Sequence, residues 1–550
     1  MQPAGSPDPR NSRVWRKLSP EALDSLRGPI LLRQTSSIEE NWRWGAEDSS
    51  AVEEHDGASW DADWEWGAES KHQNGNTRPA LPTSPICQFA SLSHDANYLV
   101  CATDRLFVVL KAGQSQEYAL VGKGVPEDRD EQITAVTCAP LFIPSNVKSG
   151  VSISVIVGFS SGYFRIYDER GRLLISHLLN LSPVIGIKIR TITPTSLATS
   201  IEPDGDEVLI IYGDSKAVSI DGPSVWMAIK VVAGYKDFGE TLEQPALVYK
   251  KWQFDKQKRI LDMVSLGPAS ATVISPPAFH PVSSTFLSTR RTARYIGVGR
   301  PMITFYATSE AGRSHSLKNV ATKVTSAVTN AMFSFAKTIW THTPTSLTSA
   351  YPPSTPSPPG TPTSSTPTLP DTVAPPVRMP ALCTLSDTQR QITSIKLSPP
   401  CTLTGKSKLA AVTDSLGRCM LVDVEEAMVV RVFKGVRDAQ CGWVQVEAGL
   451  RGGSGGRHDT PEGSRRRGKP PTLLLAIYVA RGVLELYHVR HGPRVAALAV
   501  DRECKLVQTA TGVLGGAYGG QGGPGTGGLA QCVLVGPTGE VRRVRPEGCF

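Results

Sequence analysis

The pentapeptide GFSSG at residues 158–162 has the Gly-x-Ser-x-Gly spacing of a hydrolase nucleophile elbow. In an elbow, a strand turns sharply into a helix and presents the serine hydroxyl above a parallel sheet. Here the apolar run at 151–159 is followed by another run of strand composition at 163–167. The glycines therefore predict a hairpin turn, and this context argues against a hydrolase.

Two other groups of reactive residues also lack the arrangement that their chemistry requires. Gly405-Lys406-Ser407 resembles the end of a phosphate-binding loop, but Pro400 stands where the motif needs its first glycine. The 10 cysteines include no Cys-x-x-Cys pair, and the 10 histidines include neither His-Glu-x-x-His nor a paired spacing. We therefore expect no catalytic residue, no metal site and no cofactor.

Charge and hydropathy limit the partners of the chain. The formal net charge is +8, but the basic residues are dispersed, apart from a local group at 465–467. A nucleic-acid-binding protein concentrates such charge on one face, so we expect no nucleic-acid partner. Residues 1–20 lack a signal-peptide pattern, and no apolar run approaches the ~18 residues that span a bilayer. We expect a cytoplasmic protein whose association with membranes is peripheral.

The segment from Leu409 to Val446 gives the clearest view of the fold. It contains three short apolar runs divided by turns at 415–418 and 425–426. Runs of four to six residues rich in Val, Leu and Met are typical of strands in a sheet that is buried on both faces. The segment therefore predicts a three-stranded meander, which is most of one β-propeller blade.

The same succession of strand and turn recurs along the chain. Sets of strands begin near residues 85, 131, 183, 245, 392, 441 and 503. This pattern predicts an all-β fold in which residues 85–550 form a β-propeller of about seven blades. Six or eight blades also fit, because no regular Trp-Asp repeat marks the blades.

Two segments interrupt the pattern of strands. Residues 316–340 place apolar residues at helical spacing and predict an inserted amphipathic helix. That helix either packs on the side of the propeller or meets a partner or an anionic membrane surface. Residues 341–380 are rich in Pro, Ser and Thr and predict an extended linker.

Residues 1–84 have the composition of a disordered acidic tail. Within this tail the hexapeptide WRWGAE at 42–47 recurs as WEWGAE at 64–69. Trp42, Trp44, Trp64 and Trp66 are therefore candidates for a linear motif, since a tryptophan inserted into a pocket carries much of the energy of an interface. The alternative is a duplication within a low-complexity segment.

Several segments occur together in an order that resembles a known family. They include VIVGFSSGYFRIYDERGRLLISHLLNLSPVIGIKIRT (155–191), LVYKKW (247–252), ATKVTSAVTNAMF (321–333) and KGVRDAQCGWVQ (434–445). The chain resembles the N-terminal propeller domain of the regulatory, non-catalytic subunit of the Rab-three GTPase-activating protein complex.

The resemblance implies a regulatory subunit that is not an enzyme and that works with a catalytic subunit and Rab small GTPases. In that family the arginine finger that accelerates GTP hydrolysis belongs to the catalytic partner. The complex also promotes nucleotide exchange on Rab-eighteen-type GTPases, at endoplasmic reticulum and vesicle membranes. Members continue into a long helical C-terminal region, whereas this chain ends at Phe550, so contacts made through that region are not carried over. The alternative function is that of a propeller scaffold in a vesicle coat or tethering complex.

Lys434, Arg437, Asp438, Gln440 and Trp443 are the candidate residues for binding a partner on one loop-bearing face. In the alternative interpretation, Trp443 packs between blades, and Arg437 with Asp438 fixes the corner by charge-assisted hydrogen bonds.

Overall fold

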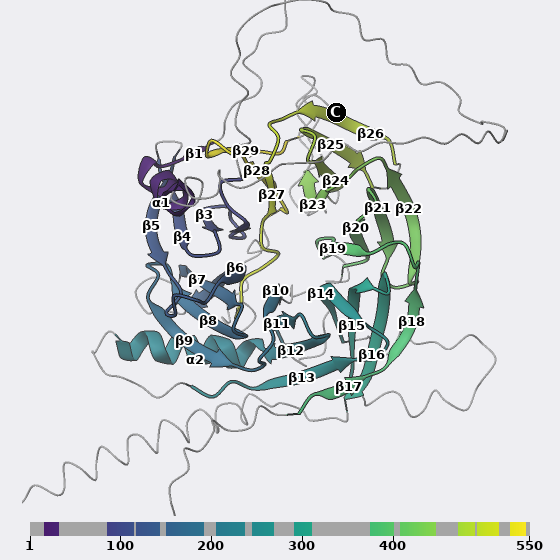
Figure 1. Ribbon diagram of the computed structural model, residues 1–550, viewed down its shortest axis with the longest axis horizontal. Coiled ribbons are helices and arrows are strands. Elements are labelled where there is room, and N and C mark those ends of the chain that lie inside the picture. The colour runs from purple at the N-terminus through teal and green to yellow at the C-terminus, as the bar shows by residue number, and fades with distance from the viewer. Residues whose placement is uncertain are drawn as a thin grey trace, which may run out of the picture.

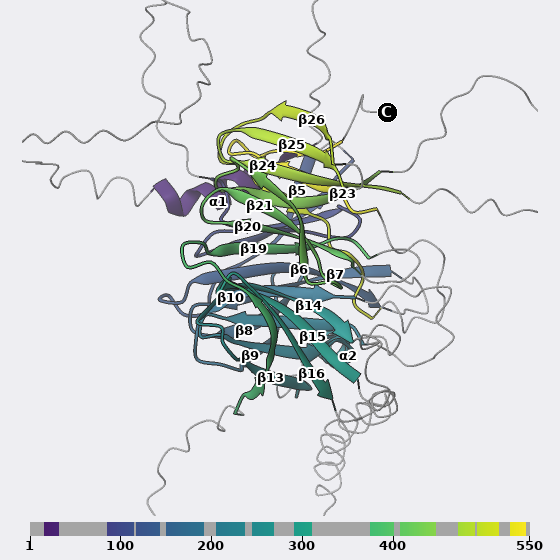
Figure 2. The same cartoon turned by 90° about the vertical axis from the view of Figure 1, so that its right-hand side faces the viewer.

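The chain forms a ring of β-sheets around a common axis (Figure 1). The computed structural model describes residues 16–31, 85–114, 117–143, 150–191, 205–236, 245–268, 291–310, 375–400, 407–446, 471–489, 492–515 and 529–545. Most of these residues belong to strands. Figure 2 shows the ring from its edge, where strands of neighbouring sheets lie beside one another. This radial arrangement confirms the predicted all-β, propeller-type fold.

Five of the sheets have four or five strands each. One consists of β6 (Ile133–Ile143), β7 (Gly150–Phe159), β8 (Tyr163–Asp168) and β9 (Leu173–Leu178). The next consists of β10 (Val184–Arg190), β11 (Glu207–Tyr212), β12 (Lys216–Asp221), β13 (Tyr249–Phe254) and β17 (Val377–Met379). A third consists of β14 (Arg259–Pro268), β15 (Arg291–Arg300), β16 (Ile303–Glu310) and β18 (Ala381–Leu385).

The remaining two of these five sheets come from the second half of the chain. One consists of β19 (Ile392–Leu397), β20 (Leu409–Asp414), β21 (Arg418–Asp423) and β22 (Met428–Lys434). It contains the meander predicted from the sequence, preceded by one more strand. The other consists of β23 (Gln440–Val446), β24 (Thr472–Val479), β25 (Val483–His488) and β26 (Arg494–Ala499).

The sixth sheet has eight strands and joins the two ends of the described chain. In order, it consists of β2 (Phe89–Leu92), β3 (Tyr98–Ala102), β4 (Phe107–Ala112), β5 (Glu117–Gly124), β1 (Arg16–Leu18), β29 (Glu540–Arg543), β28 (Cys532–Val535) and β27 (Lys505–Gln508). The short strand β1 pairs parallel with β5 and antiparallel with β29. Since β2 also contacts β27, the ring is closed at two places.

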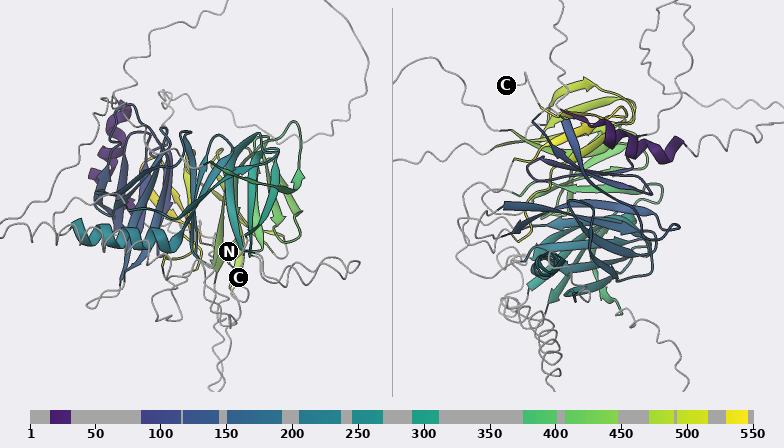
Figure 3. Two further views of the ribbon diagram at one scale, coloured as in Figure 1. Left: turned by 90° about the horizontal axis from the view of Figure 1, so that it is seen from below. Right: turned by 90° about the vertical axis from the view of Figure 1, so that its left-hand side faces the viewer.

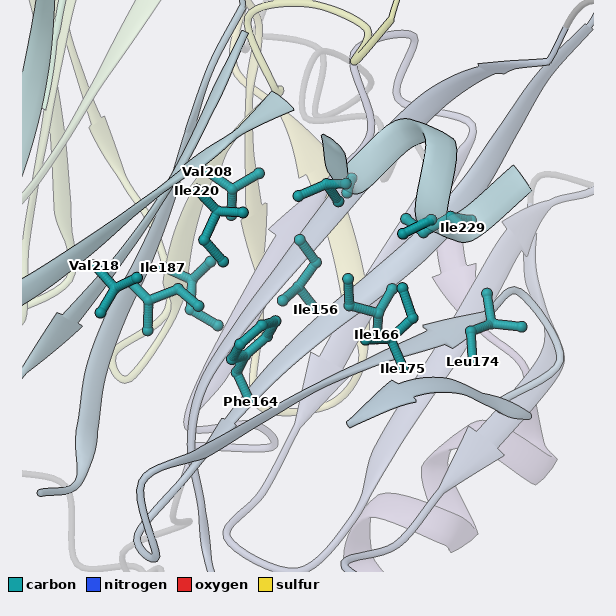
Figure 4. Packing of buried hydrophobic residues seen from close by; sticks show 14 of the residues in the cluster. Ile156, Phe164, Ile166, Leu174, Ile175, Ile187, Val208, Val218, Ile220 and Ile229 are labelled. Carbon is teal, nitrogen blue, oxygen red and sulfur yellow. The ribbon is translucent and has the colours of Figure 1, made fainter. Parts of the chain in front are cut away.

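The hydrophobic core lies between neighbouring sheets. One cluster is shared by the sheet β6–β9, the sheet that begins at β10 and the helix α2 (Gly222–Lys236), as Figure 4 shows. Ile156, Phe164 and Val208 are among its members. The middle strand β11 is buried along its whole length. A strand covered on both faces has no polar side, which is why these strands are continuous apolar runs.

Helix α2 was not expected from the sequence. It begins at Gly222-Pro223, where proline in the first turn costs no hydrogen bond, and it contacts β9 and β12. The indole Nε1 of Trp226 donates a 2.6 Å hydrogen bond to the carbonyl oxygen of Phe142 on β6. Figures 2 and 3 show α2 and the N-terminal helix α1 (Pro20–Leu31) towards opposite faces of the ring.

The predicted start of a strand set near residue 245 is wrong. The strand expected there is β13, which pairs with β12 as a late strand of the preceding sheet, and the following sheet begins at β14. The helix α2 and residues 237–244 separate β13 from β12 in the sequence, so spacing alone assigned β13 to the wrong sheet. The other six predicted starts lie close to β2, β6, β10, β19, β23 and β27.

Part of the predicted disordered tail is ordered. Of residues 1–84, the structure describes 16–31, which form β1 and α1. Leu18, Ala22 and Leu26 are buried against β4, β5 and β29. The prediction failed here because β1 and α1 are too short to be recognised from a sequence period. They are stabilised by packing against the sheet edges that they cover.

The predicted linker at 341–380 is also too long. Its last residues, Val377–Met379, form β17, which pairs parallel with β13. Residues 341–374 of that linker and the predicted helix 316–340 lie outside the described residues. Within the described part of the chain, neither helix is long and apolar enough to span a membrane.

A candidate interaction surface on the outer rim

The pentapeptide GFSSG forms a hairpin, as predicted. It joins β7 to β8, which pair antiparallel, and Gly162 takes a φ of +91°. A Cβ atom at Gly162 would lie 2.0 Å from the carbonyl oxygen of Asn180, so only glycine fits this turn. Ser160 Oγ accepts a 3.0 Å hydrogen bond from the backbone N–H of Gln132. The context of a nucleophile elbow is therefore missing.

The remaining motifs carry no further site among the described residues. Ser407 Oγ donates a 2.6 Å hydrogen bond to the carbonyl oxygen of Ser398, whereas Gly405 and Lys406 lie outside the described residues. The four tryptophans of the predicted linear motif also lie outside the described residues: Trp42, Trp44, Trp64 and Trp66. No group of three or more His, Cys, Asp or Glu side chains in the described ranges is placed to hold a metal ion.

The predicted partner-binding residues separate into a pair that bonds to neighbouring sheets and an exposed group. Trp443 is 0% exposed, and its Nε1 donates a 3.1 Å hydrogen bond to the carbonyl oxygen of Lys396 on β19. Its backbone N–H donates a 3.1 Å hydrogen bond to the side chain of Gln508 on β27. Trp443 thus joins three neighbouring sheets. This position agrees with the interpretation in which Trp443 packs between blades.

Gln440 also joins two sheets. Its Nε2 donates to the carbonyl oxygen of Cys504 at 3.1 Å, and its Oε1 accepts from the backbone N–H of Leu506 at 2.8 Å. Both hydrogen bonds link β23 to the segment around β27. A side-chain amide that satisfies backbone groups in this way fixes the distance between two sheets. Trp443 and the half-buried Gln440 therefore hold neighbouring sheets together.

Lys434, Arg437 and Asp438 are exposed. They belong to the corner that leads from β22 to β23, where Gly435 and Asp438 have φ values of +76° and +51°. The backbone N–H of Val436 anchors this corner by a 2.9 Å hydrogen bond to the carbonyl oxygen of Gly417. Within the described residues, no ion pair ties Arg437 to Asp438, so the backbone fixes the corner.

Lys434 is the last of four exposed residues of β22. Met428, Val430 and Val432 precede it at every second position and are 55%, 56% and 40% exposed. A β-bulge between Val429 and Arg431 shifts the register, so Val432 and Lys434 lie on the opposite face of the strand from Met428, and both faces of β22 expose apolar side chains. β22 pairs only with β21, which leaves its other edge without a strand among the described residues.

The outer strands of the two flanking sheets also expose apolar side chains. On β18, Leu382 and Leu385 are 66% and 44% exposed, and on β26 Leu498 is 44% exposed. Figure 1 shows β18, β22 and β26 in succession along one side of the ring. We call the following residues the apolar rim: Leu382, Leu385, Met428, Val430, Val432 and Leu498.

Elsewhere on the ring, three strands on the outer side have a neighbouring element. β5 pairs with β1, β9 contacts α2, and β13 pairs with β17. No further strand pairs with β18, β22 or β26 in the described ranges, nor with the three-residue strand β17, whose Val377 is 59% exposed. Exposed apolar edge strands favour association with another chain, and proteins usually cover them or place charges on them. The apolar rim therefore has the properties of an interaction surface.

Charges of opposite sign lie at the two ends of β22. Glu425 and Glu426 are exposed in the turn before the strand, whereas Lys434 and Arg437 are exposed at and after its end. In the register of the sheet, Lys434 lies opposite Arg418, which strengthens the basic end. A partner with complementary charges would therefore bind in one direction along β22.

The sequence analysis missed the apolar rim, although it identified the strand. The run MVVRVF at 428–433 reads as a strand that is buried on both faces. Its exposure follows from its place as the last strand of its sheet, before the chain returns to the axis at β23. The charged residues that interrupt and follow the run, Arg431 and Lys434, are the signal that could have identified an outer strand.

The fold and this surface define a class of protein: a propeller-type ring of sheets whose outer strands expose apolar side chains on one side. Comparison with known families then gives a specific assignment. Residues 87–507 match the family described as the Rab3 GTPase-activating protein regulatory subunit N-terminus, and the chain belongs to this family. The resemblance inferred from the sequence is thereby confirmed.

The solved structures to which the chain is similar include the crystal structure of the Saccharomyces cerevisiae protein Sqt1. The identity is 10%, the alignment covers 83% of each chain, and the TM-score is 0.37. At this level of similarity the comparison adds nothing to the assignment of fold or function.

Proposed function

We propose that the chain is a non-catalytic scaffold of a Rab GTPase-regulating complex and that it binds the catalytic subunit through the apolar rim. The membership of the regulatory-subunit family supports a role beside a catalytic partner. The three uncovered outer strands β18, β22 and β26, with their exposed apolar residues, support the location. In such a complex the residue that stabilises the transition state of GTP hydrolysis comes from the catalytic partner.

The apolar rim has the composition of the centre of an interface. Burying a Val, Leu or Met side chain completely stabilises a complex by roughly 1.5–3 kcal/mol. A few such residues surrounded by polar groups carry most of the binding energy of a typical interface. Lys434, Arg437 and Asp438 would then lie at the border of the interface and set the orientation of the partner.

We also propose that the ring has seven blades. The eight-stranded sheet contains a set β2–β5 and a set β27–β29, which β1 joins edge to edge. We count these two sets as separate blades, which gives seven in all. In this count β1 is the outermost strand of the last blade, and β18, β22 and β26 are the outermost strands of three consecutive blades.

The wider setting is proposed from the family resemblance. The scaffold would support regulation of Rab GTPases, including nucleotide exchange, in vesicle traffic. It would act in the cytoplasm, with peripheral association at endoplasmic reticulum or vesicle membranes.

The decisive experiment is co-purification of the full chain with the catalytic subunit after substitution of one rim residue. Val430→Asp should weaken binding at least about 100-fold, because an unpaired carboxylate in a buried interface costs several kcal/mol and each 1.4 kcal/mol is a factor of ten. Leu181→Asp is the matched control, since Leu181 is 75% exposed but lies outside the rim. Thermal unfolding of both variants verifies that each is folded.

The outcomes separate the two parts of the proposal. If the unmodified chain binds and Val430→Asp binds equally well, the rim is not the interface. If the unmodified chain does not bind the catalytic subunit, the scaffold proposal itself is wrong, and a coat or tethering scaffold becomes the better interpretation.

A further inference from the structure

The strands nearest the axis of the ring carry an unequal set of charges. These inner strands are β6, β10, β14, β19, β23 and β27 (Figure 1), together with β2, which contacts β6 and β27. Their basic residues are Lys188, Arg190, Arg259, Lys396 and Lys505, whereas Asp262 is their only acidic residue. A neutral scaffold has no need for such an excess of positive charge around its axis.

Two of these basic residues have carboxylate partners. Arg190 Nε donates a 3.2 Å hydrogen bond to Glu207 on β11. Lys188 Nζ lies 2.9 Å from the carboxylate of Asp262. That carboxylate also accepts hydrogen bonds from the backbone N–H groups of Met263 at 2.9 Å and Ile395 at 3.1 Å. The carboxylate of Asp262, the single acidic residue of the inner strands, is therefore already bonded to Lys188 and to two backbone N–H groups.

Lys396 lies next to Ile395 on β19 and has no ion pair or hydrogen bond of its Nζ within the described residues. Its side chain is exposed, but because its strand is on the inside of the ring, the surrounding sheets still reduce the hydration of its ammonium group. The backbone at Lys396 is fixed, because its carbonyl oxygen accepts from the buried Trp443 indole. Lys505 on β27 likewise has no acidic partner in the described ranges.

The surroundings disfavour the charged form of Lys396. The nearby ammonium of Lys188 lowers the pKa of Lys396 to about 8, and loss of hydration and the ammonium of Lys505 act in the same direction. Asp262 offsets only part of this effect. A mutual repulsion of this kind is relieved when an anion binds between the ammonium groups.

We propose that Lys188, Lys396 and Lys505, the axial lysines, form a binding site at the axis of the ring for an anion that carries clustered phosphate groups. Three ammonium groups with one carboxylate leave an excess of two positive charges, which a multivalent anion neutralises better than a monovalent one. Lysine is a common ligand of phosphate and binds it as a point charge. The same chemistry is found in soluble polyphosphates and in phosphoinositide headgroups.

The test is a calorimetric titration of the full chain with inositol hexakisphosphate at low salt, beside sedimentation with vesicles that contain phosphatidylinositol bisphosphate. Lys396→Met should weaken binding at least tenfold, and adding Lys505→Met should weaken it further. Lys123→Met is the control, because Lys123 is exposed on the outer strand β5. Methionine keeps most of the length of the lysine side chain and removes its charge.

The two arms distinguish the sources of the anion. Binding of inositol hexakisphosphate without vesicle sedimentation would assign a soluble ligand, and vesicle sedimentation that depends on Lys396 would assign a headgroup. The proposal is overturned if the unmodified chain binds neither probe, or if Lys123→Met loses as much affinity as Lys396→Met.

Thermal unfolding guards against an effect on folding. Without anion, Lys396→Met should unfold at the same or a higher temperature than the unmodified chain, because it removes a repulsion. With inositol hexakisphosphate, the unfolding temperature of the unmodified chain should rise and that of Lys396→Met should not. An equal rise in both proteins contradicts the site.

Discussion

Glu207 shows how one buried carboxylate fixes the contact between two sheets. It lies on β11 and accepts hydrogen bonds from Ser219 (2.5 Å), Ser265 (2.5 Å), Tyr295 (2.8 Å) and Arg190 (3.2 Å). Burial by itself raises the pKa of Glu207, but Arg190 and the three hydroxyl groups outweigh it and hold the pKa below its ordinary value. Glu207 is therefore ionised in the folded protein, and its partners depend on that charge.

We expect Glu207→Gln to lower the free energy of unfolding at pH 7 by about 3 kcal/mol, because it leaves Arg190 without its carboxylate. The dependence on pH should change as well. A carboxyl group whose pKa is lowered by folding stabilises the protein above its unfolded pKa of about 4.3, and this contribution is lost as the pH falls through the folded pKa. Urea unfolding between pH 3 and pH 7 measures both effects.

The control for Glu207→Gln is Glu426→Gln, which changes an exposed carboxylate in the β21–β22 turn. The control should remain within about 0.5 kcal/mol of the unmodified chain. Equal urea midpoints for the two variants at pH 7 would show that the Glu207 network contributes no net stability.

At the scale of single residues, the sequence identified the right segment but not the direction of its side chains. Residues 434–445 contain Lys434, which is exposed, and Trp443, which is fully buried. Nothing in the local pattern separates the two, because burial depends on whether a neighbouring sheet lies against the strand. The apolar rim could not be predicted for the same reason. It consists of residues whose types are typical of a core.

At the scale of elements, short apolar runs and glycine turns predicted most strands, whereas elements that depend on tertiary contacts were missed. The strand β17 forms because β13 offers an unpaired edge, and β1 forms because β5 and β29 offer two. Helix α2 was missed because its apolar residues lie on most sides. Its length of 15 residues and Pro223 near its start were the available signals.

The uncovered edge of β22 leads to a prediction about the isolated chain. An apolar edge strand pairs with other edges, so the purified chain should self-associate as its concentration rises. Val430→Lys places a charge in the middle of β22 and should reduce this self-association without changing the unfolding temperature. Sedimentation velocity over a range of concentrations measures the effect.

The control for this prediction is Leu181→Lys, because Leu181 is exposed outside any edge strand. It should leave self-association unchanged. If Val430→Lys and Leu181→Lys behave alike, the β22 edge does not drive the association.

At the scale of the whole molecule, the ring is closed by segments from both ends of the described chain. Near the axis, β2 contacts β27, and the backbone N–H of Ala510 donates a 3.0 Å hydrogen bond to the carbonyl oxygen of Leu92. At the outside, β1 lies between β5 and β29, and α1 buries Ala22 and Leu26. The closure therefore has an inner and an outer part, and the outer part depends entirely on residues 16–31.

Deletion of residues 1–31 should open the outer closure. It removes the buried side chains of Leu18 and Leu26, each of which stabilises the fold by roughly 1.5–3 kcal/mol. We therefore expect the free energy of unfolding to fall by about 3–5 kcal/mol, and the unfolding temperature to fall with it. Deletion of residues 1–15 leaves β1 and α1 in place and is the matched control.

Hydrogen exchange locates the effect of this deletion on the ring. The backbone amides of β5 and β29 that face β1 should exchange quickly after deletion of residues 1–31, since they lose the strand between them. The amides of β19–β22, in a separate sheet, should keep their protection, because the inner contact between β2 and β27 still holds the ring. Unchanged exchange in β5 and β29 would show that β1 covers these edges without stabilising them. Loss of protection in every sheet would instead make the N-terminal segment the closure on which the whole ring depends.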